Sequence, residues 1–273
     1  MSTTAIHGIG SMGGAILDAL VAEGVGDAAG GAGGGEVLAV VRRAEQAEQL
    51  RDRLQGTRGS VATTEEAAAA ADLHLVAVKP YSVADVLEAI APSLRPGAVV
   101  VSLALGVTNA DLAAHLPEGT AVVRAMPNTP ARVGQGMVVL SPGETVTDEQ
   151  LGLVRAALAA TGRTLVLPES QQDAATALSG SAPAYFYLFV EAMVDAGVAR
   201  GLTRADAREL ATQAALGAGT MLRETGEEAA VLRAQVTSPG GSTAAALARL
   251  EAHGLRHAVA DAITTCADRS AGR

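Results

Sequence analysis

The chain has 273 residues and a formal net charge of −9, and 49% of its residues are hydrophobic although only 2% are aromatic. This length allows two domains, with cores built from Ala, Val and Leu. The acidic charge argues against a nucleic-acid partner. The single cysteine, Cys266, excludes a disulfide framework, the N-terminus lacks a signal-peptide pattern, and no apolar run reaches the roughly 18 charge-free residues of a membrane span. We therefore expect a cytoplasmic protein with no nucleic-acid or membrane partner.

A glycine-rich turn lies almost at the start of the chain. The run GIGSMG at 8–13 has the spacing G-x-G-x-x-G, follows a predicted strand and opens a predicted helix, which is the context of a dinucleotide site. Gly8 would permit the tight turn, Gly10 would let a pyrophosphate approach, and Gly13 would let helix and strand pack closely. A turn without a ligand is the alternative. The residues assigned to the cofactor here are Gly8, Gly10, Ser11, Met12 and Gly13.

The end of the second predicted strand indicates which dinucleotide is bound. NAD sites usually place Asp or Glu there, to bind the ribose 2′-hydroxyl. This chain has Arg42 and Arg43 at that point, and Glu45 comes too late. Because an arginine fork matches a phosphate, we expect NADPH to bind Arg42 and Arg43, with NADH as a weaker substitute. The alternative is that both arginines belong to a solvated helix start.

Short Val-rich runs alternate with helical stretches up to about residue 166, which predicts a mostly parallel sheet covered by helices in an α/β domain over 1–166. The predicted strands are 4–7, 36–41, 61–63, 73–78, 98–103, 121–125, 137–140 and 164–167. The predicted helices are 12–23, 44–54, 65–70, 82–91, 109–115 and 148–160. The glycine-rich stretch at 26–35 is expected to be an ordinary loop.

Three loops follow the carboxyl ends of later strands, where an open parallel sheet binds ligands. They are VKP at 78–80, SLALG at 102–106 and RAMPNTP at 124–130. We expect Asn128 to hydrogen-bond the ribose or carboxamide of the cofactor, with an Asx-turn between two prolines as the alternative. Lys79 either meets a phosphate or points to solvent. The residues assigned to the cofactor in these loops are Val78, Lys79, Pro80, Ala104 and Asn128.

After Pro168 only helices are predicted, which indicates an all-helical domain over 167–273. The predicted helices are 183–199, 204–222, 227–235, 243–253 and 255–267. Four of the five aromatic residues lie in the first of these helices and point in several directions, so this helix is expected to be buried all round. Burial against a second chain is the favoured explanation, and a central helix of a monomer is the alternative. The four aromatic residues are Tyr185, Phe186, Tyr187 and Phe189.

The run VTSPGGST at 236–243 leads into an alanine-rich helix. The hydroxyl of Ser242 or Thr243 is placed to cap that helix, and the glycines let the backbone approach a ligand. A helix start has free N–H groups and a positive dipole end, which attract a carboxylate. An ordinary loop and N-cap is the alternative. The residues assigned to a small acidic substrate are Gly240, Gly241, Ser242 and Thr243.

The chain resembles the pyrroline-5-carboxylate reductase family over essentially its full length. Two departures are visible: Tyr81 stands where the family commonly has glutamine, and Ala182 where a glycine is usual. Neither removes an assigned functional group. The matching segments are GIGSMGGAI at 8–16, VKP at 78–80, RAMPNTPA at 124–131, LSGSAPAY at 178–185 and VTSPGGST at 236–243.

This resemblance implies a Rossmann domain followed by a helical dimerisation domain, with an active site between the cofactor domain and helices of both subunits, and often larger assemblies of dimers. It implies hydride transfer from the nicotinamide to the imine carbon of 1-pyrroline-5-carboxylate, which gives L-proline in the last step of proline synthesis. A protonated cyclic imine is already an electrophile, so no metal or covalent nucleophile is needed. The protein must orient the two rings and hold the carboxylate.

On this resemblance, the N–H groups of Gly241, Ser242 and Thr243 suit the carboxylate, and the Thr243 hydroxyl would donate to the imine nitrogen. Ser181 would border the same pocket, so Thr243 and Ser181 are the residues assigned to catalysis. We expect no metal, since Gly254 interrupts the spacing of His253 and His257 and no carboxylates complete a zinc site.

Three other functions are alternatives to pyrroline-5-carboxylate reduction. β-Hydroxyacid dehydrogenases resemble this architecture but use a lysine in the helical domain, whereas Lys79 is the only lysine here. A reductase of a six-membered cyclic imine stays open, because one methylene is worth only about 1–3 kcal/mol of discrimination. A non-catalytic NADP-binding sensor is disfavoured, since the loops at both halves of the expected site are complete.

Overall fold

The computed structural model describes residues 2–22, 35–64 and 70–272. The loop expected at 26–35 and the helix expected at 65–70 lie outside these ranges except for Gly35 and Ala70. Contacts between Cα atoms divide the chain into two compact units. One unit ends at Gly180 and also takes in the chain from Ala267 onward, and the other spans Ser181–Cys266.

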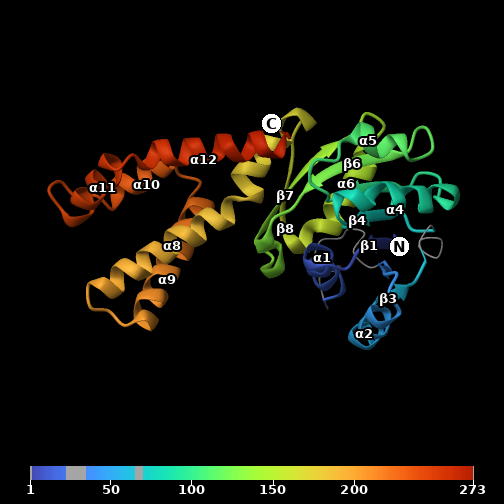
Figure 1. Cartoon of the computed structure of the whole chain (residues 1–273), viewed down its shortest axis with the longest axis horizontal. Coiled ribbons are helices and arrows are strands. Elements are labelled where there is room, and N and C mark those ends of the chain that lie inside the picture. Colours follow the sequence, from blue (N-terminus) through green and yellow to red (C-terminus); the bar gives the residue numbers. More distant parts are fainter. Residues whose placement is uncertain (1, 23–34, 65–69, 273) are drawn as a thin grey trace. The chain divides into compact units, whose positions relative to one another are not determined.

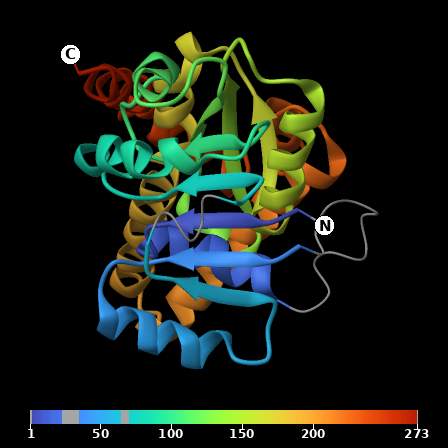
Figure 2. The same ribbon diagram turned by 90° about the vertical axis from the view of Figure 1, so that its right-hand side faces the viewer.

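An eight-stranded sheet forms the centre of the first unit, in the order β3-β2-β1-β4-β5-β6-β7-β8 (Figure 1). β7 runs antiparallel to β6 and all other neighbouring strands are parallel; Figure 2 shows the strands at the blue end of the chain pointing the same way. The strand order therefore reverses between β1 and β4, which is where such sheets bind ligands. The strands are β1 (Thr4–His7), β2 (Val37–Val40), β3 (Gly59–Ala62), β4 (Leu73–Val76), β5 (Val99–Ser102), β6 (Ala121–Met126), β7 (Gly136–Pro142) and β8 (Gly162–Val166).

Helices cover both faces of this sheet, so its central strands are apolar on both sides. Successive residues point to opposite faces: Leu75 belongs to the core under α1, α2 and α6, whereas Val76 belongs to the core under α4 and α5. All eight predicted strands are confirmed, with ends shifted by a few residues at most. The helices are α1 (Ser11–Val21), α2 (Ala44–Leu54), α4 (Val83–Ile90), α5 (Asn109–Ala114) and α6 (Asp148–Leu158).

Beyond β8 the chain stays in the first unit for one more segment, which the sequence did not predict. It forms α7 (Gln172–Ala175) and a π-helical turn at Thr176–Gly180. The buried Gln172 amide donates to the Ser141 hydroxyl of β7 at 2.9 Å. The contacts therefore divide the chain after Gly180, whereas the strands end near the predicted boundary at 166.

The second unit is helical. It consists of α8 (Ala182–Ala199), α9 (Arg204–Thr225), α10 (Ala229–Gln235), α11 (Ser242–Ala252) and most of α12 (Leu255–Ser270). α8 and α9 pack through a small buried cluster, Val194, Ala207 and Ala211. Among the described residues, no helix is both long and apolar enough to cross a bilayer.

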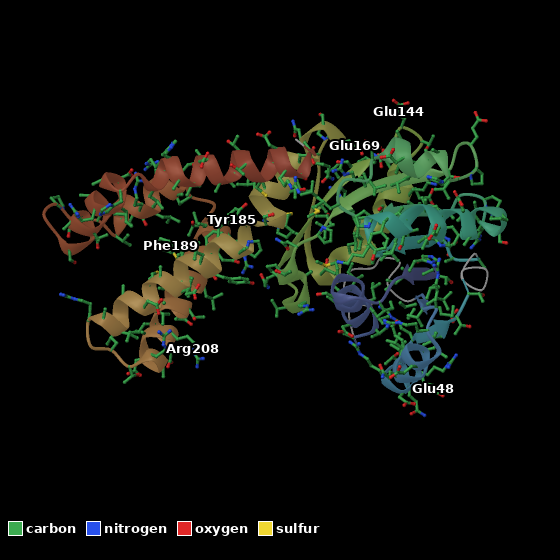
Figure 3. The ribbon with its side chains drawn as sticks, in the orientation of Figure 1. Glu48, Glu144, Glu169, Tyr185, Phe189 and Arg208 are labelled. Atoms are coloured by element: carbon green, nitrogen blue, oxygen red, sulfur yellow. The ribbon has the colours of Figure 1, made fainter. Side chains whose placement is uncertain are left out.

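α8 keeps most of its apolar surface outside this cluster. Phe186 and Leu188 are each 67% exposed, Tyr187 63% and Phe189 45%; Figure 3 labels Phe189 on this helix. The alternative of a helix buried at the centre of a monomer is therefore wrong for the single chain. An apolar surface of this kind marks a protein–protein interface.

Candidate active site

The three glycines of the turn between β1 and α1 have three different surroundings. Gly8 has a φ of +93°, and a Cβ there would lie 2.7 Å from Val78 Cγ1. A Cβ on Gly13 would overlap the carbonyl oxygen of Gly8, so the helix packs directly on the turn. A Cβ on Gly10 would meet no atom of the described residues within 4 Å, so this stretch of backbone faces open space among them. These are the geometries that a tight turn, close packing and an approaching pyrophosphate need, and the residues present fit a dinucleotide.

A cleft of about 460 Å³ opens beside this turn. It brings together Arg42 and Arg43 after β2 with Val78 after β4, as the sequence predicted, and none of the described residues that line it is acidic. Both arginines are exposed. Sequence reasoning missed Tyr81 and Gln46: Tyr81 is 83% exposed at the cleft, and the Gln46 amide donates to the Ile9 carbonyl at 3.0 Å. The position of Tyr81 directly after the VKP run was the only signal for it.

The other predicted cofactor residues lie at neighbouring strand ends but do not line this cleft. Lys79 and Pro80 are exposed at the start of a 3-10 turn before α4. Ala104 is buried after β5, where its N–H donates to the Ser102 hydroxyl at 3.3 Å. Contact of these three residues with a cofactor stays a prediction.

Asn128 has protein partners at both ends of its side chain. Its Nδ2 donates to the Ser179 carbonyl at 3.2 Å, and its Oδ1 accepts from the Met137 N–H at 2.9 Å. The residue is only 8% exposed. These bonds hold the loop after β6 against β7 and the π-helical turn, and the hydrogen bond expected from Asn128 to the cofactor stays a prediction.

Arg124 anchors the base of the same loop. Its guanidinium is buried in β6 and lies 3.6 Å from Glu169 and 3.4 Å from Asp173. Asp173 also accepts from the Ser270 hydroxyl at 2.8 Å, so the last turn of α12 is tied to this cluster. Since both carboxylates pair with a buried cation, this cluster is a structural one.

In the second unit, Ser181 lies beside two other polar side chains. The Cys266 thiol donates to the Ser181 hydroxyl oxygen across 3.2 Å, and the Tyr185 hydroxyl lies next to both. Interaction with the Cys266 side chain, together with burial, raises the pKa of Tyr185. The Ser181 side chain acts on the Tyr185 hydroxyl in the opposite direction and lowers its pKa.

The turn at 236–243 has a different helix start from the one expected. α11 begins at Ser242, its N-cap is Gly241, and no side chain caps it, so the prediction that Ser242 or Thr243 is the cap is wrong. Gly240 has a φ of +69°, and the Gly241 N–H donates to the Ser238 carbonyl at 3.1 Å. Because the turn ends at Gly241, α11 begins one residue earlier than expected. Ser242 and Thr243 therefore both lie in the first turn of the helix.

Comparison with known proteins agrees with this geometry. Residues 3–106 match the family described as "NADP oxidoreductase coenzyme F420-dependent", and residues 169–272 match "Pyrroline-5-carboxylate reductase dimerisation". Together with the glycine turn, these matches define an oxidoreductase that uses a nicotinamide cofactor and assembles through a dimerisation domain. The pyrroline-5-carboxylate reductase of Corynebacterium melassecola is 41% identical over 99% of this chain and 98% of its own, and that of Escherichia coli is 38% identical over 96% and 95%. The chain belongs to the pyrroline-5-carboxylate reductase family.

Solved structures agree. A pyrroline-5-carboxylate reductase from Coxiella burnetii superposes with a TM-score of 0.89 at 33% identity, covering 98% of this chain and 97% of that one. The Plasmodium falciparum pyrroline carboxylate reductase, solved with NADP bound, gives 0.82 at 26% identity, covering 99% and 97%. The chain is thus an NAD(P)H-dependent enzyme that acts on a carbon–nitrogen double bond of a small molecule and forms homo-oligomers.

Proposed function

We propose that this enzyme reduces 1-pyrroline-5-carboxylate to L-proline with NADPH in preference to NADH. The observation that carries the cofactor preference is the pair of exposed arginines, Arg42 and Arg43, in a cleft whose described lining residues include no acid. A 2′-phosphate would gain charge-assisted hydrogen bonds there, whereas a bare 2′-hydroxyl would find no carboxylate to accept from it.

The turn Gly240–Thr243 is proposed to hold the substrate. No side chain caps α11, so its first N–H groups are not engaged by a side chain, and they would bind the substrate carboxylate. The Thr243 hydroxyl would donate to the imine nitrogen, and Ser181 would border the same pocket. When bound, the reduced nicotinamide supplies the hydride that the imine carbon receives.

Assembly from dimers is part of the proposal. The exposed aromatic residues of α8 supply an apolar surface that a second copy of the chain would cover, and the match to a dimerisation family includes this helix. We also place the enzyme in the cytoplasm, because a chain with a single cysteine suits a reducing compartment.

The experiment that tests the function is an absorbance assay of NADPH oxidation with 1-pyrroline-5-carboxylate and with its six-membered homologue. We expect the five-membered imine to give the higher kcat/KM. A higher value for the six-membered ring would move the assignment to that substrate. Tight NADPH binding without turnover of either imine would instead favour a non-catalytic NADP-binding sensor.

A further inference from the structure

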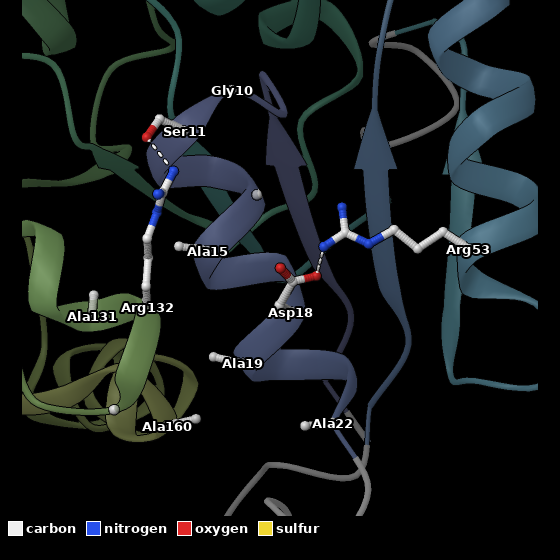
Figure 4. Close-up of a pocket in the computed structure, with 12 residues that line it drawn as sticks. Gly10, Ser11, Ala15, Asp18, Ala19, Ala22, Arg53, Ala131, Arg132 and Ala160 are labelled. Carbon is white, nitrogen blue, oxygen red and sulfur yellow. Dashed lines mark hydrogen bonds and ion pairs between the residues drawn. The ribbon is translucent and has the colours of Figure 1, made fainter.

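We propose that Arg132 is a further cofactor-binding residue, whose guanidinium binds the pyrophosphate of the dinucleotide at the N-terminus of α1. Arg132 lies in the 3-10 turn Thr129–Val133 that follows β6. Its Nη2 donates to the Ser11 hydroxyl at 2.7 Å, although the two residues are 121 positions apart in the chain. Figure 4 shows the Arg132 side chain extending beside α1 to its first turn.

The electrostatics of this helix start favour an anion. The N-terminus of α1 carries the positive end of the helix dipole, and a cation there is unfavourable unless a negative charge is also present. The first turn of α1 contains no acidic residue, and its N-cap is Gly10, which has no side chain to accept a hydrogen bond. Within the described ranges Arg132 pairs with no carboxylate. The negative charge that this end of the helix favours is therefore one that a ligand would bring.

The space around the guanidinium allows that ligand to approach. Arg132, Ser11 and Gly10 line one part of a second cleft, of about 660 Å³, and the backbone at Gly10 faces open space. Arg132 is exposed, so packing does not explain its position. A guanidinium has five N–H donors, and the bond to Ser11 uses one of them. The others would reach a phosphate, for which an arginine fork has the right geometry.

The same cleft contains a second arginine that serves as a control. Arg53 forms an ion pair with Asp18, further along α1 than Ser11, and Figure 4 shows this pair apart from Arg132. Both arginines are exposed and both reach α1 from another element. Only Arg132 lies at the helix N-terminus, so only Arg132 should affect an anion bound there.

This inference rests on the dinucleotide site and not on the proposed preference for NADPH, since NADPH and NADH share the pyrophosphate. Calorimetric titration of the purified full-length enzyme, without imine, should show that Arg132→Gln weakens both dinucleotides by a similar factor of about 10. Binding of 2′-AMP, which has the 2′-phosphate but no pyrophosphate, should stay unchanged. Arg53→Gln should leave all three ligands bound as in the parent.

The outcomes distinguish the Arg132 proposal from the proposed preference for NADPH. The double change of Arg42 and Arg43 to Ala should weaken NADPH and 2′-AMP but not NADH, and its failure would leave the Arg132 proposal standing. Unchanged binding of NADPH and NADH to Arg132→Gln would overturn the proposal, as would a loss confined to NADPH. Arg132→Lys keeps the charge but loses the fork, so it should weaken NADPH and NADH alike by a few-fold, less than Arg132→Gln does. If Arg132→Gln fails to fold, Arg132→Lys decides, and parental affinity of Arg132→Lys for both dinucleotides would count against the proposal.

Discussion

His7 and His74 stack on neighbouring parallel strands, with ring centroids 5.4 Å apart and His7 Nε2 lying 3.1 Å from His74 Nδ1. Burial, the His74 ring and Arg42 lower the pKa of His7 to about 3. Burial also lowers the pKa of His74 to about 4, against the opposing effects of the Ala71 backbone and the Asp72 carboxylate. Both rings are therefore neutral in the folded protein throughout the physiological pH range.

This pair predicts an acid-labile fold. Both folded-state pKa values lie below the unfolded value of 6.5, so the unfolded chain binds more protons as pH falls below 6.5. The free energy of unfolding should fall by roughly 2 kcal/mol per histidine between pH 7 and pH 5. Urea unfolding at fixed protein concentration, at pH 7 and at pH 5, measures this change in the free energy of unfolding. His74→Leu should remove about half of this pH dependence, whereas His257→Gln, at an exposed position on α12, should not. An unchanged slope in His74→Leu contradicts the assignment.

Cofactor preference is predicted to depend on Arg42 and Arg43. One charge-assisted hydrogen bond is worth about 1.5–3 kcal/mol, so one good contact favours NADPH by roughly 10- to 100-fold. Steady-state kinetics with both cofactors should show this ratio in kcat/KM. The double change to Ala should bring the ratio close to one, mainly by weakening NADPH. Equal use of NADH by the parent enzyme would contradict this prediction.

The fold was predictable because local patterns decide most of it. Leu73–Val76 and Val99–Ser102 are short runs that are mainly apolar, and each is fully buried in the sheet. The turn at Gly8 was predictable for the same reason, since its positive φ favours glycine and the spacing of the three glycines is distinctive. These features depend on neighbours in sequence.

Features that depend on distant residues were not predictable. The Asn128 side chain bonds to Met137 and Ser179, and no local pattern shows that these groups surround it. The Ser11 contact with Arg132 likewise joins two distant loops. The start of α11 was missed by one residue for another reason: serine and glycine both occur at N-caps, and the turn closed by Ser238 selects the glycine.

The apolar face of α8 is predicted to hold the oligomer together. Static light scattering at micromolar concentration should give a dimer or a multiple of it. Replacing Phe186 and Tyr187 together by Glu places two charges on a surface that a second copy of the chain would cover, and should yield monomers with little activity. Glu48→Lys, at an exposed position on α2 of the first unit, is the control and should leave the mass of the oligomer unchanged. A fully active monomer of the parent chain would overturn the interface.

Thr243 is predicted to donate a hydrogen bond to the imine nitrogen of the substrate and so to assist its protonation. A positioned proton donor contributes about 10²–10⁴-fold, and the imine is able to arrive already protonated, so Thr243→Ala should lower kcat by a factor near the low end of that range. Thr243→Ser keeps the hydroxyl and should retain most of the activity. NADPH affinity, measured by titration, should be the same in both variants. An equal loss in the Ser variant would show that the methyl group matters rather than the hydroxyl.

The backbone at Ser242 offers a test of carboxylate binding that Gly241 does not. A side chain at Gly241 would overlap the Ser238 hydroxyl, so Gly241→Val would disturb the turn itself. Ser242 is the first residue of α11, where proline is tolerated, and Gly241 has the extended conformation, with φ −76° and ψ 170°, that a following proline requires. Ser242→Pro therefore removes one N–H group while it leaves the helix in place.

Ser242→Ala is the matched control, because it removes the hydroxyl but keeps the N–H. If the N–H groups at the start of α11 hold the substrate carboxylate, Ser242→Pro should raise the inhibition constant of proline-like carboxylates by about 10-fold or more, since a hydrogen bond to a charged group is worth about 1.5–3 kcal/mol. Ser242→Ala should change it little, and NADPH should bind both variants as it binds the parent. Equal inhibition of the Pro and Ala variants would mean that the carboxylate is bound elsewhere, and the assignment of Gly240–Thr243 to the substrate would then be wrong.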